Sequence, residues 1–394
     1  MSDNYLKRLE RNIPLYYVFK IFTKRVYLPL IALFLVNDAQ LTLAEIAVIA
    51  SITTIAQMFL DLPTGYIADR WGHKKAIALG TFAASLSPLA YLAFPNFSGG
   101  LAASLLFFGG WSFVSGAAQA FIHDTLKVLN RAHEYSKLMG RAQGFGLLGN
   151  VLLITIVPLT WGIDHRLPFL IGFFSTFTTF ILALCFTIPR VEHDIAKKRT
   201  SLLTTLREIP VPYLLFTLMM YGIVAAAFDF GPQYRELVFT NLGIPTAYFG
   251  FILALGSIAA AIAGRFIHLL DKIRPSSFYL FDALFMVAVF VAIGSFTNPI
   301  LSILAFMLLP AYDRNRAIIA ESHMLARYPD HHHKATLVSV LDFYPRLNGI
   351  WVPLAFAAIT GAFGLQSGYA VFGLILLPVL LLLYVTYRLT TSGK

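Results

Sequence analysis

The sequence predicts an all-α polytopic membrane protein with twelve transmembrane helices in two pseudo-symmetric bundles of six. Long apolar runs recur along the 394 residues, and only 13% of the residues are charged, against about 25% in a typical soluble domain. The basic residues gather in alternate loops between those runs. Together these observations exclude an ordinary soluble domain and favour a chain that crosses the bilayer many times.

Each predicted helix is an apolar run that can cross the hydrocarbon core, which takes about 20 residues in helical conformation. Half of the runs precede a long polar loop and half follow it. In chain order, the runs span residues 14–36, 42–65, 75–94, 99–122, 139–162, 167–189, 212–234, 245–268, 276–295, 299–326, 335–362 and 368–389.

The distribution of positive charge predicts the orientation. Of the 30 Lys and Arg residues, only Arg166 and Arg235 fall in predicted outer loops, and most of the others flank the spans on the opposite side. Cytoplasmic loops carry such an excess, so we expect both termini in the cytoplasm. The net charge of +10 is then a topology signal, and no nucleic acid is expected as a partner. We expect a monomeric integral protein of a bacterial cytoplasmic (inner) membrane, surrounded by the lipid bilayer.

The polar loop at 191–211 separates the two predicted bundles and is expected to be cytoplasmic. The first bundle covers residues 1–190 and the second covers 212–394. The halves are distantly alike, because "GYIADRWGHKK" after the second span occupies the same place as "GRFIHLLDKIR" after the eighth. Duplicated halves are typical of secondary transporters.

The stretch "DLPTGYIADRWGHKKAIALG" at 61–80 is the most specific motif. Gly65 and Gly72 permit a tight turn between closely packed helix ends. Asp69 is placed to accept hydrogen bonds from a helix N-terminus or an arginine, and Arg70 and Lys74 hold the turn on the cytoplasmic side. On composition alone, an ordinary basic hairpin between two spans is the favoured interpretation.

This turn resembles the signature of the major facilitator superfamily, and the resemblance extends over nearly the whole chain. The family pattern is Gly, three residues, Asp-Arg, one residue, Gly, and then basic residues. His73 stands where the family usually has Arg or Lys. The matching residues are Gly65, Asp69, Arg70, Gly72, Lys74 and Lys75.

The resemblance implies a secondary active transporter that works by alternating access of two six-helix bundles. It implies that Asp69 and Arg70 belong to a cytoplasmic gate, with Asp124 and Arg141 as their candidate partners. It also implies that spans one, four, seven and ten line the central cavity. Span five lacks the Gly-Pro-Gly-Gly-type pattern of family antiporters and has "GRAQGFGLLG" at 140–149 instead.

Nine charged residues stand out inside the predicted spans: the cations Lys20, Lys24, Arg25, Arg314, Arg316 and Arg346, and the acids Asp282, Asp313 and Asp342. Each charge costs about 2.5–3.5 kcal/mol at the bilayer centre on insertion scales, so these ions must pair or line a wetted cavity. Most of them lie at a similar depth, roughly 10–16 Å from the inner side.

Helical spacing predicts some of their partners. Asp342 and Arg346 share a helix face at i, i+4, and Asp313 and Arg316 are close in angle, so each pair can form within one helix. The two lysines of span one also share a face. Arg314 points elsewhere. An alternative interpretation is that these ions only lock the helices together.

The cations exceed the acids, and a positive surplus in a cavity favours anionic or zwitterionic cargo. We therefore expect a proton-coupled transporter of a small organic anion or zwitterion. The candidate proton carriers are Asp282, Asp313 and Asp342. The candidate residues of the substrate cavity are Lys20, Lys24, Asp313, Arg314, Arg316, Arg346, Trp111 and Gln119.

Two other functions stay open: proton-driven efflux of amphiphilic or drug-like compounds, and a non-transporting receptor or scaffold with the same fold. The sequence has no nucleotide-binding loop, zinc-ligand spacing or hydrolytic triad, so we expect no enzyme, no catalytic residues, no cofactor and no metal site. The histidine triplet at 331–333 lacks further ligands and is interpreted as a solvated loop. Asp229 is interpreted as an outer-gate or surface group.

Overall fold

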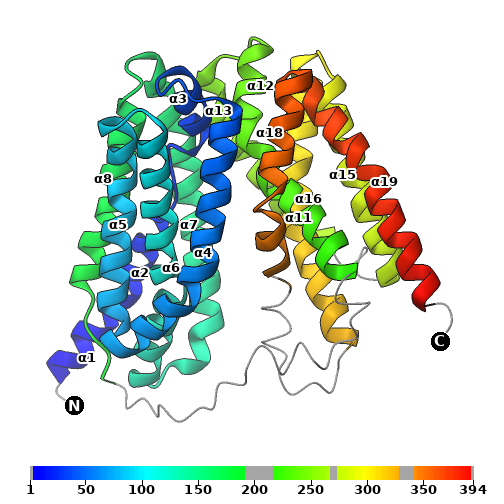
Figure 1. The fold of residues 1–394 in the computed structure, drawn as a ribbon. Coiled ribbons are helices and arrows are strands. Elements are labelled where there is room, and N and C mark those ends of the chain that lie inside the picture. The colour runs from blue at the N-terminus through cyan, green and yellow to red at the C-terminus, as the bar shows by residue number, and fades with distance from the viewer. Residues whose placement is uncertain (1–2, 191–215, 267–272, 328–340, 342, 392–394) are drawn as a thin grey trace. The chain divides into compact units, whose positions relative to one another are not determined.

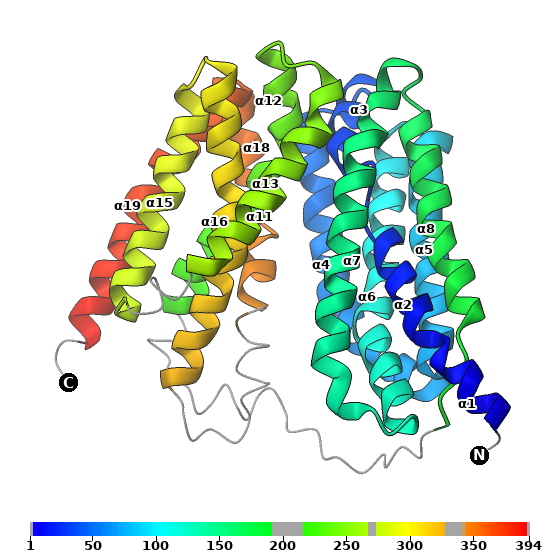
Figure 2. The ribbon, with the colours of Figure 1, turned by 180° about the vertical axis from the view of Figure 1, so that it is seen from behind.

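The structure is a computed structural model that describes residues 3–190, 216–266, 273–327, 341 and 343–391. Every regular element in these residues is helical, which confirms the predicted all-α class (Figures 1 and 2). The predicted domain boundary at 191–211 lies outside the described residues and stays a prediction. The chain divides into two compact units, one formed by Met1–Thr42, Ile52–Ile195 and Thr246–Phe251, the other by Leu43–Ser51, Ala196–Pro245 and Ile252–Lys394.

The first unit is a bundle whose helices are coloured blue to green in Figure 1. Its helices are α1 (Asp3–Glu10), α2 (Asn12–Phe22), α3 (Ile31–Asn37), most of α4 (Leu43–Trp71), α5 (His73–Ala93), α6 (Phe97–Val128), α7 (Tyr135–Ile156) and α8 (Leu167–Cys185). α5 packs against both α6 and α8, and α2 packs against α7 and α8. The bundle buries a core of apolar and aromatic side chains contributed by most of these helices.

The second unit is built from helices that are more often interrupted. They are α11 (Gly222–Phe230), α12 (Arg235–Asn241), most of α13 (Phe249–Ala263), α15 (Pro275–Ser295), α16 (Pro299–Arg327), α18 (Val352–Phe363) and α19 (Leu365–Thr391), with further helical residues at 343–348. α15 packs against α16 and α19, and α11 packs against α15, α16 and α18.

Eight of the described helical stretches are long and apolar enough to cross a membrane. They correspond to predicted spans two to six, eight, nine and twelve. The other four predicted spans differ for physical reasons. Spans one, seven and eleven are interrupted helices, and span ten is α16, whose 29 residues include several charges. Long apolar runs therefore predict the straight spans well and the broken ones less well.

Predicted span one is a broken helix. α2 ends at Phe22, and helical structure resumes only at Leu28. Pro29 explains the break, because a proline inside a helix lacks the N–H donor and clashes with the carbonyl four residues earlier, which is that of Arg25. That carbonyl instead accepts a hydrogen bond from the Leu28 amide at 3.0 Å. Lys24 and Arg25 thus lie outside regular helix, and the helix face predicted for the two lysines ends before Lys24.

Span seven is interrupted in a similar way at Pro232. A 3-10 turn at Gly231–Tyr234 separates α11 from α12. The Gly231 carbonyl accepts a hydrogen bond from the Tyr369 hydroxyl at 2.5 Å. The chain continues as helix to Asn241, so span seven extends further than the predicted end at residue 234.

Span eleven is interrupted after Pro345. Residues 343–348 are helical, residues 349–351 form a turn, and α18 begins at Val352. Pro353 occupies the first turn of α18, a position where its missing N–H removes no helical hydrogen bond. The break of this span therefore lies at the start of α18.

Candidate functional site

Three cations of the first unit gather at the break in span one. Lys20 lies near the end of α2, and Lys24 and Arg25 follow in the nonhelical segment. Lys20 and Lys24 are close enough to repel each other electrostatically. The Lys20 ammonium lies 5.6 Å from the ring centre of Tyr16. Lys20 and Arg25 are half-buried and Lys24 is exposed, so this group of cations is accessible.

Aromatic rings enclose Arg25. Its guanidinium carbon lies 4.0 Å from the ring centre of Phe107 and 5.0 Å from that of Phe108. The ring centre of Tyr27 lies at 5.8 Å, and Nη2 donates a long hydrogen bond of 3.5 Å to the Tyr91 hydroxyl. Ring faces attract a guanidinium electrostatically. The sequence identifies Arg25 as an intramembrane cation but gives no sign of this enclosure, because Phe107 and Phe108 lie far along the sequence, on α6.

α6 places two predicted cavity residues in the first unit. Gln119 is exposed and Trp111 is half-buried, and Trp111 stacks on Phe107 with their planes 3° apart. One residue on, the Ser112 hydroxyl donates to a carboxylate oxygen of Asp61 on α4 at 2.6 Å. The predicted charged layer omits Asp61, although this residue lies inside predicted span two.

The second unit contains a buried ion pair. The side chains of Arg316 on α16 and Asp282 on α15 are each only 1% exposed. Nε of Arg316 donates to one carboxylate oxygen of Asp282 at 2.7 Å, and Nη2 donates to the other at 2.5 Å. The predicted contact with Asp313 also occurs, with Nη1 of Arg316 3.8 Å from a carboxylate oxygen. The main partner of Arg316 thus comes from another helix, which helical spacing cannot reveal.

Around this pair lies a second group of charges that solvent can reach. The Asp313 side chain is 31% exposed, and Arg346 and Asp229 are exposed. Asp229 is within electrostatic range of Asp313, Arg316 and Arg346. The interpretation of Asp229 as an outer-gate group is therefore wrong: α12 carries span seven on beyond residue 234, which leaves Asp229 mid-span.

Two predicted site residues have side chains that lie outside the described part of the chain. Asp342 lies outside the described residues, and so does the side chain of Arg314, whose backbone belongs to α16. The predicted pairing of Asp342 with Arg346 therefore stays a prediction. The histidine triplet at 331–333 likewise lies outside the described residues.

The signature turn joins α4 to α5. α4 continues through Gly65 to Trp71, and Gly72 makes the turn with φ of +93°. Glycine adopts this conformation without steric cost. A Cβ at Gly65 would meet no other atom within 4 Å. One of the two predicted glycines therefore bends the chain, and the other lies within helix.

The candidate gate residues lie around the same end of the first unit. Asp69 and Arg70 are exposed at the end of α4, and Arg141 is exposed on α7. Asp124, near the end of α6, is buried and has a carboxylate oxygen 3.7 Å from Nε2 of His73. His73 is the residue that departs from the family pattern, and it pairs with a predicted gate acid. Lys74 follows it on α5 and is half-buried.

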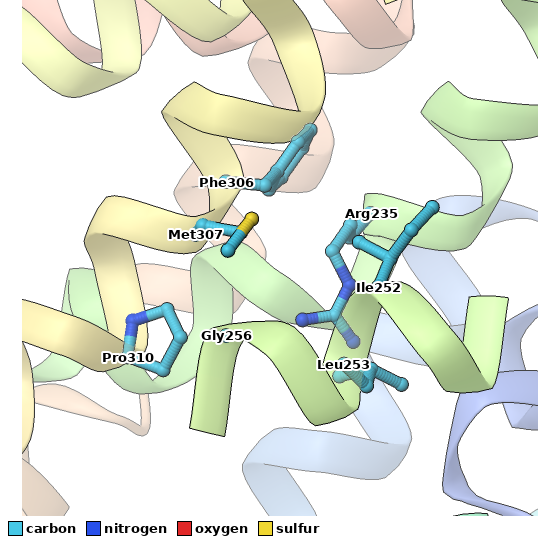
Figure 3. A pocket seen from close by; sticks show the side chains of 7 residues that line it. All are labelled: Arg235, Ile252, Leu253, Gly256, Phe306, Met307 and Pro310. Atoms are coloured by element: carbon cyan, nitrogen blue, oxygen red, sulfur yellow. The ribbon is translucent and has the colours of Figure 1, made fainter. Parts of the chain in front are cut away.

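A small cavity in the second unit involves another arginine. It has a volume of about 10 Å³, room for about one water molecule. Figure 3 shows the Arg235 side chain beside residues of α13 and α16. Arg235 is buried and donates to the Glu236 carboxylate through Nε and Nη2. The cavity is too small for a solute, so it carries no binding function. Its other lining residues are Ile252, Leu253, Gly256, Phe306, Met307 and Pro310.

The two units therefore differ in charge. In the first, Lys20 and Arg25 form no ion pair with a carboxylate of the described residues. In the second, Asp229 and Asp313 are accessible carboxylates beside arginines. No cluster of side chains that would hold a metal ion occurs in the described part of the chain.

Interrupted spans, intramembrane charges and an all-helical fold define the class of this chain: an integral membrane protein with the architecture of a secondary transporter. Comparison with known proteins makes this specific. The model of the Major Facilitator Superfamily matches residues 15–324. The chain belongs to this superfamily, as the signature turn predicted.

Relatives and solved structures agree with this assignment. An uncharacterized MFS-type transporter of Bacillus subtilis (strain 168), YxaM, is 24% identical over 375 residues, which cover 90% of each chain. A crystal structure of a variant of the nucleoside transporter NupG superposes with a TM-score of 0.81 at 12% identity, covering 97% of this chain and 100% of that one. A bacterial homologue of the human lysosomal transporter Spinster superposes with a TM-score of 0.72 at 13% identity, covering 98% of each chain.

Proposed function

We propose that this protein is a proton-coupled secondary transporter of a small organic anion or zwitterion that works by alternating access. The observation that carries the proposal is the accessible group of Lys20, Lys24 and Arg25 at the break in span one. Breaks in spans are where transporters of this kind expose backbone groups and bind solutes. The positive group favours a negatively charged cargo.

Asp313 is the proposed proton carrier. It is accessible, and it lies beside Arg316 and within range of Asp229. Two carboxylates that share a site repel each other, which disfavours full ionisation of both. Asp282 is the weaker of the described candidates, because both of its oxygens bond to Arg316 in a buried pair. Asp342 remains a candidate beyond the described residues. Arg346 in the second unit, and Trp111 and Gln119 in the first, stay proposed cavity residues, as does Arg314.

The cytoplasmic gate is proposed at the signature turn. Residues there lie at the adjoining ends of α4, α5, α6 and α7, where rearranged ion pairs can open and close a path. The proposed gate consists of Gly65, Asp69, Arg70, Gly72, Lys74, Asp124 and Arg141, and the structure adds His73 as a partner of Asp124.

Efflux of amphiphilic compounds is a second candidate function. The rings of Phe107, Phe108 and Trp111 around Arg25 offer an apolar surface beside a charge. Such a surface suits molecules with an aromatic body. A non-transporting receptor or scaffold has no specific observation in its favour.

Transport in proteoliposomes tests the proposal. Purified protein is reconstituted, a pH gradient is imposed, and movement of labelled anionic, zwitterionic and cationic solutes is followed. We expect accumulation of an anion or zwitterion that a protonophore abolishes. Asp313→Asn should lose this accumulation but keep exchange of the same solute at equal pH, because exchange requires no net proton movement. Asp164→Asn, at an exposed loop, is the matched control. Movement restricted to amphiphilic cations would favour efflux instead.

A further inference from the structure

Two arginines inside the spans have similar aromatic surroundings and different counter-ions. Arg316 stacks on Tyr221 with its guanidinium carbon 4.5 Å from the ring centre, and the ring centre of Phe228 lies at 5.6 Å. Arg25 stacks on Phe107 at 4.0 Å and has two more rings within 6 Å. Ring faces alone therefore do not distinguish the two sites.

The difference lies in the carboxylate. Arg316 donates Nε and Nη2 to the two oxygens of Asp282, a fork-to-fork geometry that fixes the guanidinium. For Arg25, the described residues provide no such acid. Its Nε is buried and has no hydrogen-bond partner among them, and the bond from Nη2 to the Tyr91 hydroxyl is long, at 3.5 Å.

The neighbouring hydroxyl groups do not replace that acid. The Tyr27 hydroxyl is 3.2 Å from that of Ser87, and the Tyr91 hydroxyl is 3.4 Å from that of Ser104. Both hydroxyls thus have other partners, and neither carries a negative charge. A buried N–H donor without an acceptor costs free energy, so the unpaired Nε of this guanidinium requires an explanation.

The chain itself places Arg25 where a ligand can supply the acceptor. Pro29 ends regular helix around Arg25, which leaves the residue in an irregular segment next to the exposed Lys24. Arg25 as a whole residue is half-buried rather than fully buried. The rings of Phe107 and Trp111 stack on one another beside it.

We propose that Arg25 binds the carboxylate of a cargo molecule whose apolar or aromatic body packs against Phe107, Phe108 and Trp111. The cargo carboxylate would then play the role that Asp282 plays for Arg316. This inference rests on the proposed transport function and narrows its cargo to carboxylates with an apolar body. The alternative is that Arg25 is purely structural and only holds α5 and α6 together through its contacts with their aromatic rings.

Binding of a matched acid and amide to the purified full chain tests the inference. The probes are phenylacetate and phenylacetamide, which share a body and differ in charge. Binding is followed by the fluorescence of Trp111 in a variant whose other three tryptophans are replaced by phenylalanine, and by the shift in melting temperature. We expect wild type to bind the acid in preference to the amide. Equal binding of the two probes, or binding of neither, would overturn the inference.

Substitutions then separate binding from bracing. Arg25→Lys keeps the positive charge but loses the planar fork, so it should weaken phenylacetate binding about tenfold or more while leaving binding of the amide unchanged. Arg25→Gln should remove the preference for the acid. Arg166→Gln, which removes a charge in an outer loop, is the matched control and should bind both probes as wild type does. A purely structural role predicts that Arg25→Lys lowers the melting temperature and leaves the preference for the acid intact.

The outcomes also separate this inference from the proposed transport function. If proteoliposomes accumulate an anion and Arg25→Lys retains both that transport and acid binding, Arg25 is not the carboxylate site, and transport stands. If the acid binds through Arg25 and wild type moves no solute, the site stands and the transport function fails.

Discussion

Single charged residues in the spans are stabilised in different ways. Arg316 and Asp282 neutralise each other in a bidentate pair within the second unit. Arg25 relies on ring faces, and Asp61 accepts a hydrogen bond from Ser112. A buried pair of this kind contributes little net stability, yet it is very sensitive to loss of one member, which leaves an uncompensated charge.

The Arg316–Asp282 pair provides the first prediction. Asp282→Asn should destabilise the protein by about 3–5 kcal/mol, because it leaves the Arg316 charge buried without its main counter-ion. The measurement is thermal or denaturant unfolding of the purified protein in detergent. Asp164→Asn, at an exposed loop, should change stability by less than about 0.5 kcal/mol.

A double variant checks the cause of that loss. Asp282→Leu combined with Arg316→Met removes both charges and should recover most of the stability lost in Asp282→Asn. If the double variant is less stable than the single one, the pair contributes through packing rather than through charge compensation.

A second residue-level prediction concerns the inner turn before α7. Arg131 donates two hydrogen bonds of 2.8 Å to the Glu134 carboxylate, and these bonds, with the nearby positive charges, hold the pKa of Glu134 below its ordinary value of 4.5. A lowered pKa means that the contact is fully formed above pH 4.5 and is lost as the pH falls through the lowered value.

Arg131→Gln should therefore raise the pKa of Glu134 towards its ordinary value. The measurement is a pH titration of the side-chain carbon signals in protein with labelled glutamate, observed by NMR. Lys137→Gln, which removes a weaker influence on Glu134, should produce a smaller change. Equal shifts in the two variants would show that general positive charge, and not the hydrogen bonds, lowers the pKa.

At the level of helices, apolar length and proline determine where regular structure lies. The straight spans follow from runs of apolar residues, and the predicted limits of α15 and α16 differ from the observed ones by one residue or less at each end. The breaks follow from Pro29 and Pro232, whose effects are local and readable in the sequence once their positions in the span are considered. Contacts between helices, such as that of Arg316 with Asp282, depend on packing that one sequence does not reveal.

Because one sequence does not reveal contacts between helices, the candidate site could be predicted only in part. Intramembrane position alone identified Lys20, Lys24 and Asp313, because charge in an apolar run is conspicuous. The predicted charged layer omits Asp229, because the predicted end of span seven comes too early in the sequence. The enclosure of Arg25 depends on Phe107 and Phe108, which look like ordinary apolar residues of span four.

The contact of α5 with α6 gives a prediction at this level. Their backbones approach so closely that a Cβ at Gly80 would lie 2.4 Å from the Gly110 carbonyl oxygen and 2.8 Å from Val114. Gly80→Ala should separate the helices and destabilise the unit by about 1–3 kcal/mol. Gly116→Ala, on the same α6, meets no atom within 4 Å and should be neutral or stabilising by up to about 1 kcal/mol. Melting temperatures of the two variants in detergent provide the comparison, and equal values would contradict it.

At the level of the whole molecule, the fold is that of the Major Facilitator Superfamily, and the distribution of charge predicts its orientation in the membrane. The loop between α8 and the second unit is rich in Lys and Arg, and basic residues flank the turns after α4 and α6. The turn after α7 contains only Arg166. Such an asymmetry predicts that the basic loops lie in the cytoplasm. Gradient-driven transport requires a fixed orientation, so the topology bears directly on the proposed function.

Labelling of introduced cysteines tests this orientation. Cys185 is the only cysteine, so Cys185→Ser provides a background without thiols. In that background Asp164→Cys, in the turn after α7, should react with a membrane-impermeant maleimide on intact bacterial cells that have no outer membrane. Lys137→Cys, at the start of α7, should react only after the membrane is opened, because positive-inside topology places it in the cytoplasm. Both positions are exposed, so a difference in labelling reports the side of the membrane rather than burial. Labelling of Lys137→Cys but not of Asp164→Cys on intact cells would reverse the predicted topology, and with it the side of the membrane on which the proposed gate at the signature turn lies.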